Sequence, residues 1–155
     1  MRFPALSTRF AEAAGFRPCS RPMTDVKLRA YWADCDPAGL VYFGNVFRFI
    51  GQAEEELYVR ALKNREQLFE ALGIWMPRVE AHANFLSPIR SGRAIRIRLD
   101  PQFKGDKTVR LEFEVLDEET ETRFATGYIT VVCVDRVTFK SRTIPEEIRQ
   151  VLSGP

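Results

Sequence analysis

The chain has 155 residues, of which 45% are hydrophobic and 28% charged, a size and balance that suit one domain with a substantial core. Its 23 basic and 21 acidic residues are unevenly spread, because residues 1–22 hold four of the bases and one of the acids. The remainder is close to neutral, which gives nucleic-acid binding no electrostatic support. No apolar run approaches the roughly 20 residues of a membrane-spanning helix.

The cysteines also limit the possible classes of protein. Cys19, Cys35 and Cys133 are odd in number and share no disulfide or metal-binding spacing, so we expect reduced thiols and a cytoplasmic location. We expect neither a structural metal nor a nucleic-acid or membrane partner.

Residues 1–22 differ in composition from the rest of the chain. They are rich in arginine and interrupted by proline, and they lack the apolar core of a secretory signal. We interpret them as a disordered extension, either an organellar transit peptide or non-functional sequence upstream of Met23. The domain is therefore placed at residues 23–155, and an organellar location is the alternative if the extension is a transit peptide.

The first half of the domain is predicted to contain one strand and two helices. Residues 26–33 alternate as in a strand, and the sequence DPAG at 36–39 ends that strand in a turn. Apolar side chains recur at helical spacing over residues 45–62, and Glu54 lies on the apolar face. Gly51 in this helix predicts close contact with a sheet. A shorter helix is expected at 64–73, ending at Gly73.

The second half changes to a period of two, which predicts strands. We expect them at 82–89, 94–103, 108–117 and 123–135, with a hairpin turn at 104–106 and a closing helix at 144–152. Strands that cluster after one long helix favour an α+β domain, in which an antiparallel sheet wraps around that helix. Long exposed strand edges of this kind predict pairing with another subunit.

The sequence DCDPAGLVYFGNVFRF, residues 34–49, and this order of elements together resemble the hotdog fold. More narrowly, they resemble the 4-hydroxybenzoyl-CoA thioesterase family, whose signature reads roughly D-x-D-x-x-G-[IVL]-V-Y/W-F-x-N. The resemblance covers about residues 25–150. The positions that fall on the signature are Asp34, Asp36, Gly39, Val41, Tyr42, Phe43 and Asn45.

The resemblance implies an enzyme that hydrolyses an acyl-CoA thioester. In that family the second acid, here Asp36, acts as nucleophile or as general base on water, and the backbone N–H matching Phe43 polarises the thioester carbonyl. Tyr42, Asn45 and His82 are the expected substrate-binding residues, and Asn45 is also expected to orient the turn. Coenzyme A enters as part of the substrate, so no cofactor is implied. The expected assembly is a homodimer or homotetramer with the CoA across the subunit interface.

General chemistry supports these roles independently. A helix start offers unpaired N–H groups and the positive end of a dipole, where an oxyanion is stabilised. Because a thioester has a good leaving group, one carboxylate and one polarising donor can suffice. The substrate is expected to be a small aromatic or a short- to medium-chain acyl-CoA, and naphthoyl-type thioesters belong to that set.

Several alternatives remain open at this point. Asp36 also fits a turn or helix cap, because Asp before Pro commonly begins a turn. Glu54 is the backup base, His82 fits a structural role as well as a pocket, and Tyr42 and Trp75 are candidates to contact an aromatic acyl group. The alternative function is a non-catalytic acyl-CoA-binding sensor or scaffold on the same fold. The two acids lack a third ligand that would make a metal site.

Overall fold

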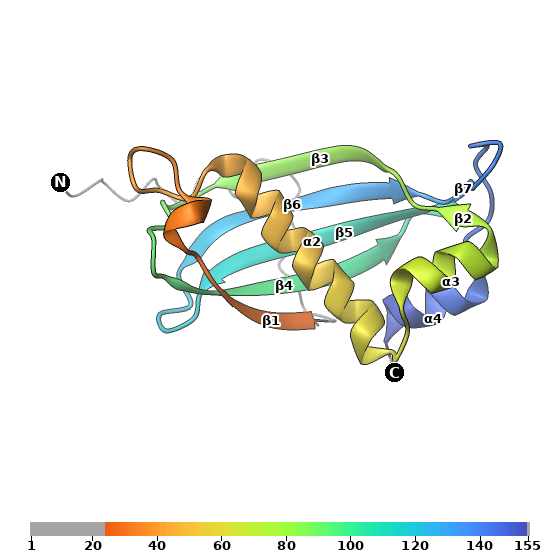
Figure 1. Ribbon diagram of the computed structural model, residues 1–155, viewed down its shortest axis with the longest axis horizontal. Coiled ribbons are helices and arrows are strands. Elements are labelled where there is room, and N and C mark those ends of the chain that lie inside the picture. The colour runs from red at the N-terminus through yellow and green to blue at the C-terminus, as the bar shows by residue number, and fades with distance from the viewer. Residues whose placement is uncertain (1–23, 155) are drawn as a thin grey trace.

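The computed structural model describes residues 24–154, and they form one antiparallel sheet with a long helix across it (Figure 1). The sheet has the order β1-β4-β5-β6-β3. The helix α2 (Phe43–Arg60) packs on one face, which confirms the predicted α+β hotdog architecture. The predicted extension at 1–22, with Cys19, lies outside the described residues.

Three strands of the sheet follow the period-two pattern closely. β4 (Ala94–Phe103) and β5 (Thr108–Asp117) have the predicted bounds. In the hairpin between them the Lys104 N–H donates to the Thr108 carbonyl at 2.8 Å. β1 (Thr24–Arg29) begins and ends earlier than predicted, and a 3-10 turn, η1 (Trp32–Asp34), follows it. Between Thr24 and Arg29, β1 pairs with residues 99 to 94 of β4.

The remaining strands correct the prediction. β3 (Arg78–Phe85) begins four residues before the expected strand and ends before Pro88. The single strand expected at 123–135 is divided into β6 (Arg123–Val132) and β7 (Val134–Asp135). β7 leaves the main sheet to pair with β2 (Ile74–Trp75), a two-residue strand that is too short to produce a periodic signal.

The helices end where their capping residues dictate. α2 begins two residues earlier than predicted, after Tyr42. In α3 (Arg65–Leu72) the side chain of Asn64 accepts the Gln67 N–H, and Gly73 closes the helix in the left-handed conformation. α4 (Glu146–Ser153) starts after Pro145. No helix among residues 24–154 is long and apolar enough to span a bilayer.

Two glycines occupy opposite environments. Gly127 of β6 lies opposite Phe113, and a Cβ at this position would stand 2.0 Å from the His82 carbonyl oxygen and 2.7 Å from Cζ of Phe113. Gly51, in contrast, would place its Cβ in open space. The expectation that Gly51 allows close contact between helix and sheet is therefore wrong, and the close approach belongs to Gly127.

This contrast predicts opposite effects on stability. Gly127→Ala must displace either β3 or the Phe113 ring, so the free energy of unfolding is expected to fall by about 1–3 kcal/mol, as overpacking usually costs. Gly51→Ala is the matched control, and it should raise that free energy by about 0.5–1 kcal/mol because Ala loses less entropy in a helix. Chemical denaturation of both variants measures the difference. Equal effects at the two positions would contradict the assignment of the close approach.

Candidate functional site

The two acids of the signature lie in a short hairpin that leads directly into α2. Cys35 and Val41 pair in antiparallel fashion, and the Asp36 N–H donates to the Leu40 carbonyl at 2.8 Å. At the base of this hairpin the Tyr42 N–H donates to the Asp34 carbonyl at 2.9 Å. The loop therefore returns the chain past both acids immediately before the helix begins.

Asp34 is a structural anchor of this hairpin. Its side chain is buried, one carboxylate oxygen accepts the Tyr31 N–H at 2.8 Å, and the other pairs with the guanidinium of Arg48 on α2. The Asp34 carbonyl also accepts the side-chain amide of Asn45 at 2.9 Å. This contact ties the loop to the first turn of α2, so Asn45 makes the kind of contact that an orienting residue requires.

Asp36 has a different environment from its neighbour. Its Oδ1 accepts the Ala38 N–H at 2.8 Å and the Leu40 N–H at 3.4 Å, so the turn-forming contact considered from the sequence is present. Among residues 24–154, Oδ2 has no hydrogen-bond donor and the carboxylate has no cationic partner. The side chain is half-buried. One oxygen holds the turn, while the other is left for solvent or a ligand.

The start of α2 supplies unpaired donors. Tyr42 precedes the helix with extended torsions, and no side chain caps it. Within the described chain the N–H groups of Phe43 and Gly44 have no acceptor, as expected of the first turn of a helix. The Tyr42 ring lies over Gly44, where an added Cβ would stand 2.8 Å from Cε1 of the ring.

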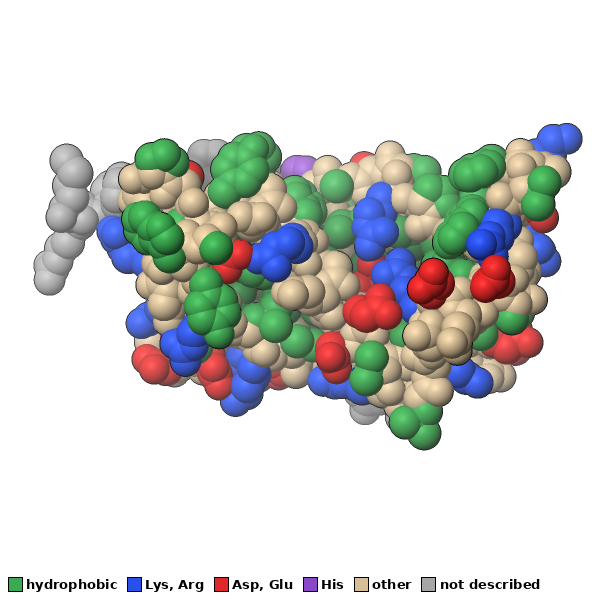
Figure 2. Space-filling view, in the orientation of Figure 1, with side chains coloured by type: hydrophobic (Ala, Val, Ile, Leu, Met, Phe, Trp, Pro, Cys, Tyr) green, Lys and Arg blue, Asp and Glu red, His purple; other side chains and the backbone are tan. Residues whose placement is uncertain are grey.

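Exposed aromatic side chains surround the same end of the molecule. The Phe43 ring lies 4.6 Å from that of Tyr42 and 6.5 Å from that of Phe85. Tyr31 and Trp32 are also largely exposed on the preceding turn. Figure 2 shows apolar side chains gathered at this end of the surface. We call Tyr42, Phe43 and Phe85 the aromatic rim.

Glu54 does not lie at this site. It is eleven residues beyond Phe43 along α2, about 16 Å at 1.5 Å per residue. Its buried carboxylate is paired with Arg65 at 3.0 Å and with Arg78. One oxygen of this carboxylate pairs with Arg65 and the other with Arg78, so the structure disfavours the role of backup base and favours a structural ion pair.

His82 is also separated from Asp36. Its ring stacks on Tyr128 at 5.4 Å, on the face of the sheet opposite α2. The Tyr128 hydroxyl and Thr130 hydroxyl donate to Glu80 there, and these hydrogen bonds hold the pKa of Glu80 below its ordinary value. The structure therefore does not bring His82 together with the hairpin acids, and the His82 Nε2 is buried without a hydrogen-bond partner among the described residues.

Three contributors to the site were missed from the sequence. Arg48 pairs with Asp34, Gly44 leaves room for the Tyr42 ring, and Phe85 completes the aromatic rim. Arg48 and Gly44 lie within the signature segment. Arg48 lies three residues after Asn45 on the predicted helix, so helical spacing could have placed it on the same face as that site residue. Phe85 comes from a distant strand and had no local signal. Across residues 24–154 no group of three metal-ligating side chains occurs.

Comparison with known proteins places this geometry in a family. The model of the thioesterase-like superfamily matches residues 31–152. A 1,4-dihydroxy-2-naphthoyl-CoA hydrolase of Thermosynechococcus vestitus is 32% identical over 97 residues, which are 63% of this chain and 66% of that protein. A protein of the same name from Nostoc punctiforme is 32% identical over 119 residues, 77% of this chain and 79% of its own.

Solved structures agree on the fold. A 1,4-dihydroxy-2-naphthoyl-CoA thioesterase from Synechocystis matches with a TM-score of 0.77 at 21% identity, over 83% of this chain and 94% of that one. A thioesterase superfamily structure from Jannaschia matches with a TM-score of 0.75 at 23% identity, over 88% and 94% of the two chains.

These likenesses confirm the hotdog prediction, and the relatives' names are consistent with the predicted CoA thioester hydrolase. The narrower resemblance to 4-hydroxybenzoyl-CoA thioesterases is not specifically supported, because these relatives are named for a different acyl group. Since the family model spans most of the chain, the protein belongs to the thioesterase-like superfamily.

Proposed function

We propose that this protein hydrolyses an acyl-CoA thioester, with the Asp36 carboxylate and the Phe43 N–H as its reacting groups. The observation that carries the proposal is the division between the two acids. Asp34 is buried and neutralised by Arg48, whereas Oδ2 of Asp36, in the loop that enters the helix, has no donor among residues 24–154. A carboxylate left unpaired beside unpaired helix N–H groups is suited to catalysis.

The hairpin geometry supports contact between these groups. The Asp36–Leu40 rung lies two residues from the Asp34–Tyr42 rung, about 7 Å along the hairpin at about 3.3 Å per residue. A thioester carbonyl whose oxygen accepts from the Phe43 N–H would thus lie within reach of a carboxylate or of one intervening water. The positive end of the helix dipole adds to the stabilisation of the oxyanion.

Two routes are consistent with this arrangement. In one, Asp36 takes a proton from water as the hydroxide adds to the carbonyl carbon, and the C–S bond then breaks with return of that proton to the CoA thiolate. In the other, the carboxylate itself displaces the thiolate and water hydrolyses the resulting anhydride. Both routes place the negative charge of the tetrahedral intermediate at the helix start.

The substrate that fits best is an aromatic acyl-CoA. The aromatic rim offers π surfaces directly beside the helix start. The relatives described above are named as hydrolases of a dihydroxynaphthoyl-CoA thioester. On the basis of that similarity, we propose that the substrate of this protein also carries a bicyclic aromatic acyl group. A short aliphatic acyl group would leave the rim without a partner.

A thiol-release assay over a panel of acyl-CoA thioesters tests the proposal. We expect one thiol per acid released, with naphthoyl-CoA and benzoyl-CoA thioesters preferred over butyryl-CoA and octanoyl-CoA. Binding of these thioesters without any thiol release would favour the sensor or scaffold alternative instead.

We also propose that the protein is a homodimer joined through β3. Among the described strands, β3 and β1 form the two edges of the sheet. β1 has three charged residues in six, which protect a free edge, whereas β3 has two in eight, Arg78 and Glu80, and exposes Val79 and Phe85. α2 packs mainly over β1 and β4, so the helix-side face of β3 is left for a second copy to cover.

Light scattering provides the test of the dimer. We expect twice the chain mass of 17.8 kDa, and we expect Val79→Asp to shift the mass towards the monomer at low micromolar concentration, because the two-fold axis brings two charges to one interface. Leu62→Asp is the control, since Leu62 is equally apolar and 93% exposed just beyond α2, the helix that packs mainly over β1 and β4. A wild-type monomer would contradict the proposal, and a tetramer would require a second interface.

A further inference from the structure

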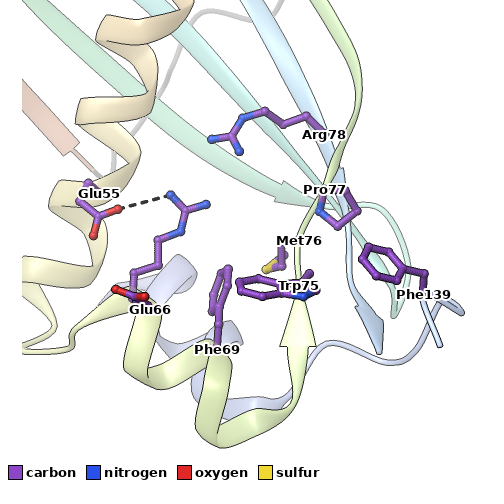
Figure 3. Close-up of a pocket in the computed structure, with 9 residues that line it drawn as sticks. Glu55, Glu66, Phe69, Trp75, Met76, Pro77, Arg78 and Phe139 are labelled. Atoms are coloured by element: carbon purple, nitrogen blue, oxygen red, sulfur yellow. Dashed lines mark hydrogen bonds and ion pairs between the residues drawn. The ribbon is translucent and has the colours of Figure 1, made fainter. Parts of the chain in front are cut away.

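An open pocket lies at the other end of α2, bordered by α3, β2 and the start of β3 (Figure 3). Its volume is about 720 Å³, within the range of small-molecule sites. Glu55, on its α2 side, is twelve residues beyond Phe43, about 18 Å along the helix. In a single subunit this pocket is therefore separate from the hairpin and the helix start.

The floor of the pocket is aromatic. Phe69 of α3 and Trp75 of β2 point towards one another, and Met76 lies beside them (Figure 3). The guanidinium of Arg136 covers one face of the Trp75 ring at 4.7 Å, which leaves the other face to the pocket. Flat aromatic walls of this kind favour a planar ligand.

The polar groups of the pocket are paired donors and acceptors. Arg65 and Arg78 share the buried Glu54 carboxylate, and Arg65 also reaches Glu55 at 3.4 Å. Arg78 extends from β3 into the pocket (Figure 3), and its guanidinium keeps N–H donors beyond the one given to Glu54. Glu66 lines the same pocket. Arg136 beside Trp75 is paired with Glu70 at 3.1 Å. Four carboxylates therefore offset the three guanidiniums, and the site has no surplus positive charge for an anion.

Phe139 stands at the mouth of the pocket in a conformation that is unusual for a bulky residue. Its φ is +55° and its side chain is 65% exposed, so the ring gains little from burial and the backbone is strained. The loop is held by Asp135, whose carbonyl accepts the Phe139 N–H at 3.0 Å. The Asp135 carboxylate accepts hydrogen bonds from the Thr138 N–H, the Thr138 hydroxyl and the Val137 N–H. These hydrogen bonds hold the pKa of Asp135 below its ordinary value.

From these four observations we propose that the pocket binds an uncharged aromatic ring that carries hydroxyl or carbonyl oxygens, with Phe139 as its outer wall. The arginine N–H groups would donate to ring oxygens, and Glu55 and Glu66 would accept from ring hydroxyls. A phosphate-bearing nucleotide is disfavoured by the carboxylates. The strain at Phe139 is retained because that ring contacts the ligand rather than the protein core.

The role of the ligand rests on the proposed function and on the β3 dimer. Two β3 strands related by a two-fold axis run antiparallel, so the Arg78 end of one lies opposite the Phe85 end of the other. Phe85 contacts Phe43 at the start of α2. The pocket of one subunit would thus lie beside the helix start of the other and hold the acyl ring of the thioester cleaved there.

Calorimetric titration of the full-length protein with 1-naphthol tests the site, with naphthalene, 1-naphthoate and adenosine 3′,5′-bisphosphate as comparison ligands. We expect 1-naphthol to bind most tightly and to quench Trp75 in a Trp32→Phe background, since the chain has only these two tryptophans. A bisphosphate that displaces 1-naphthol and itself quenches Trp75 would instead assign the pocket to the nucleotide and overturn the proposal, as would the absence of quenching by 1-naphthol.

Two variants locate the binding. Phe139→Gly should weaken 1-naphthol binding by at least about fivefold without lowering the unfolding midpoint, because glycine adopts positive φ freely. Arg78→Lys keeps the charge beside Glu54 but loses the planar donor fork, so it should weaken 1-naphthol binding and leave naphthalene binding unchanged. Unchanged 1-naphthol affinity in both variants would refute the site. These titrations need no hydrolysis, so their failure is distinguishable from failure of the thioesterase proposal.

Discussion

Asp36→Asn is expected to fold normally and to lose about a hundredfold or more in kcat/KM for thioester hydrolysis. Asparagine keeps an oxygen that can accept the Ala38 and Leu40 N–H groups, so the turn persists. What is lost is the basicity and the negative charge of the carboxylate, and general-base catalysis alone typically contributes about 10²–10⁴-fold. Thiol release from an aromatic acyl-CoA, measured beside a denaturation curve, separates these two properties.

Asp34→Asn is the matched control for that experiment. The substitution removes the charge of a buried carboxylate that pairs with Arg48, so the free energy of unfolding is expected to fall by about 1–3 kcal/mol. The two acids should thus separate into one that supports activity and one that supports stability. Turnover at the wild-type rate by Asp36→Asn would remove the catalytic assignment and leave an acyl-CoA-binding protein.

The central fold was predictable because its signals are local and periodic. The alternating residues of β4 and β5 have only one arrangement that buries Ile95, Ile97 and Leu111 on one side, so even the bounds of these strands were correct. The end of α3 was equally clear from Gly73. In contrast, β2 and β7 exist only because two distant pairs of residues meet, which no sequence window contains.

The site was predictable to the extent that one segment carries it. The hairpin acids, the helix start and Asn45 all lie within residues 34–45, and short-range hydrogen bonds within that segment join them. The predictions for Glu54 and His82 were weaker, because partners from other elements decide their roles. Glu54 lies on the apolar face as expected, yet Arg65 and Arg78 reach it from α3 and β3. Register with Tyr128 directs His82 away from α2.

Phe43→Pro is expected to retain the helix and to reduce kcat by about 10²–10³-fold, the usual cost of one oxyanion donor. Proline removes the backbone N–H at this position, and Phe43 is the first residue of α2, where proline is well tolerated. Tyr42 already has φ −58° and ψ 131°, which are torsions that a residue before proline prefers. The substitution therefore deletes the proposed donor with little change to the backbone.

Because proline also replaces the ring of Phe43, Phe43→Ala is measured in the same assay. Alanine keeps the N–H and removes the ring contacts with Tyr42 and Phe85, so it should raise KM and reduce kcat only a few-fold. The ratio of kcat between the alanine and proline variants then isolates the amide. If the two variants lose kcat equally while circular dichroism shows intact helices, the oxyanion is stabilised elsewhere, and the Gly44 N–H is the next donor along the same helix start.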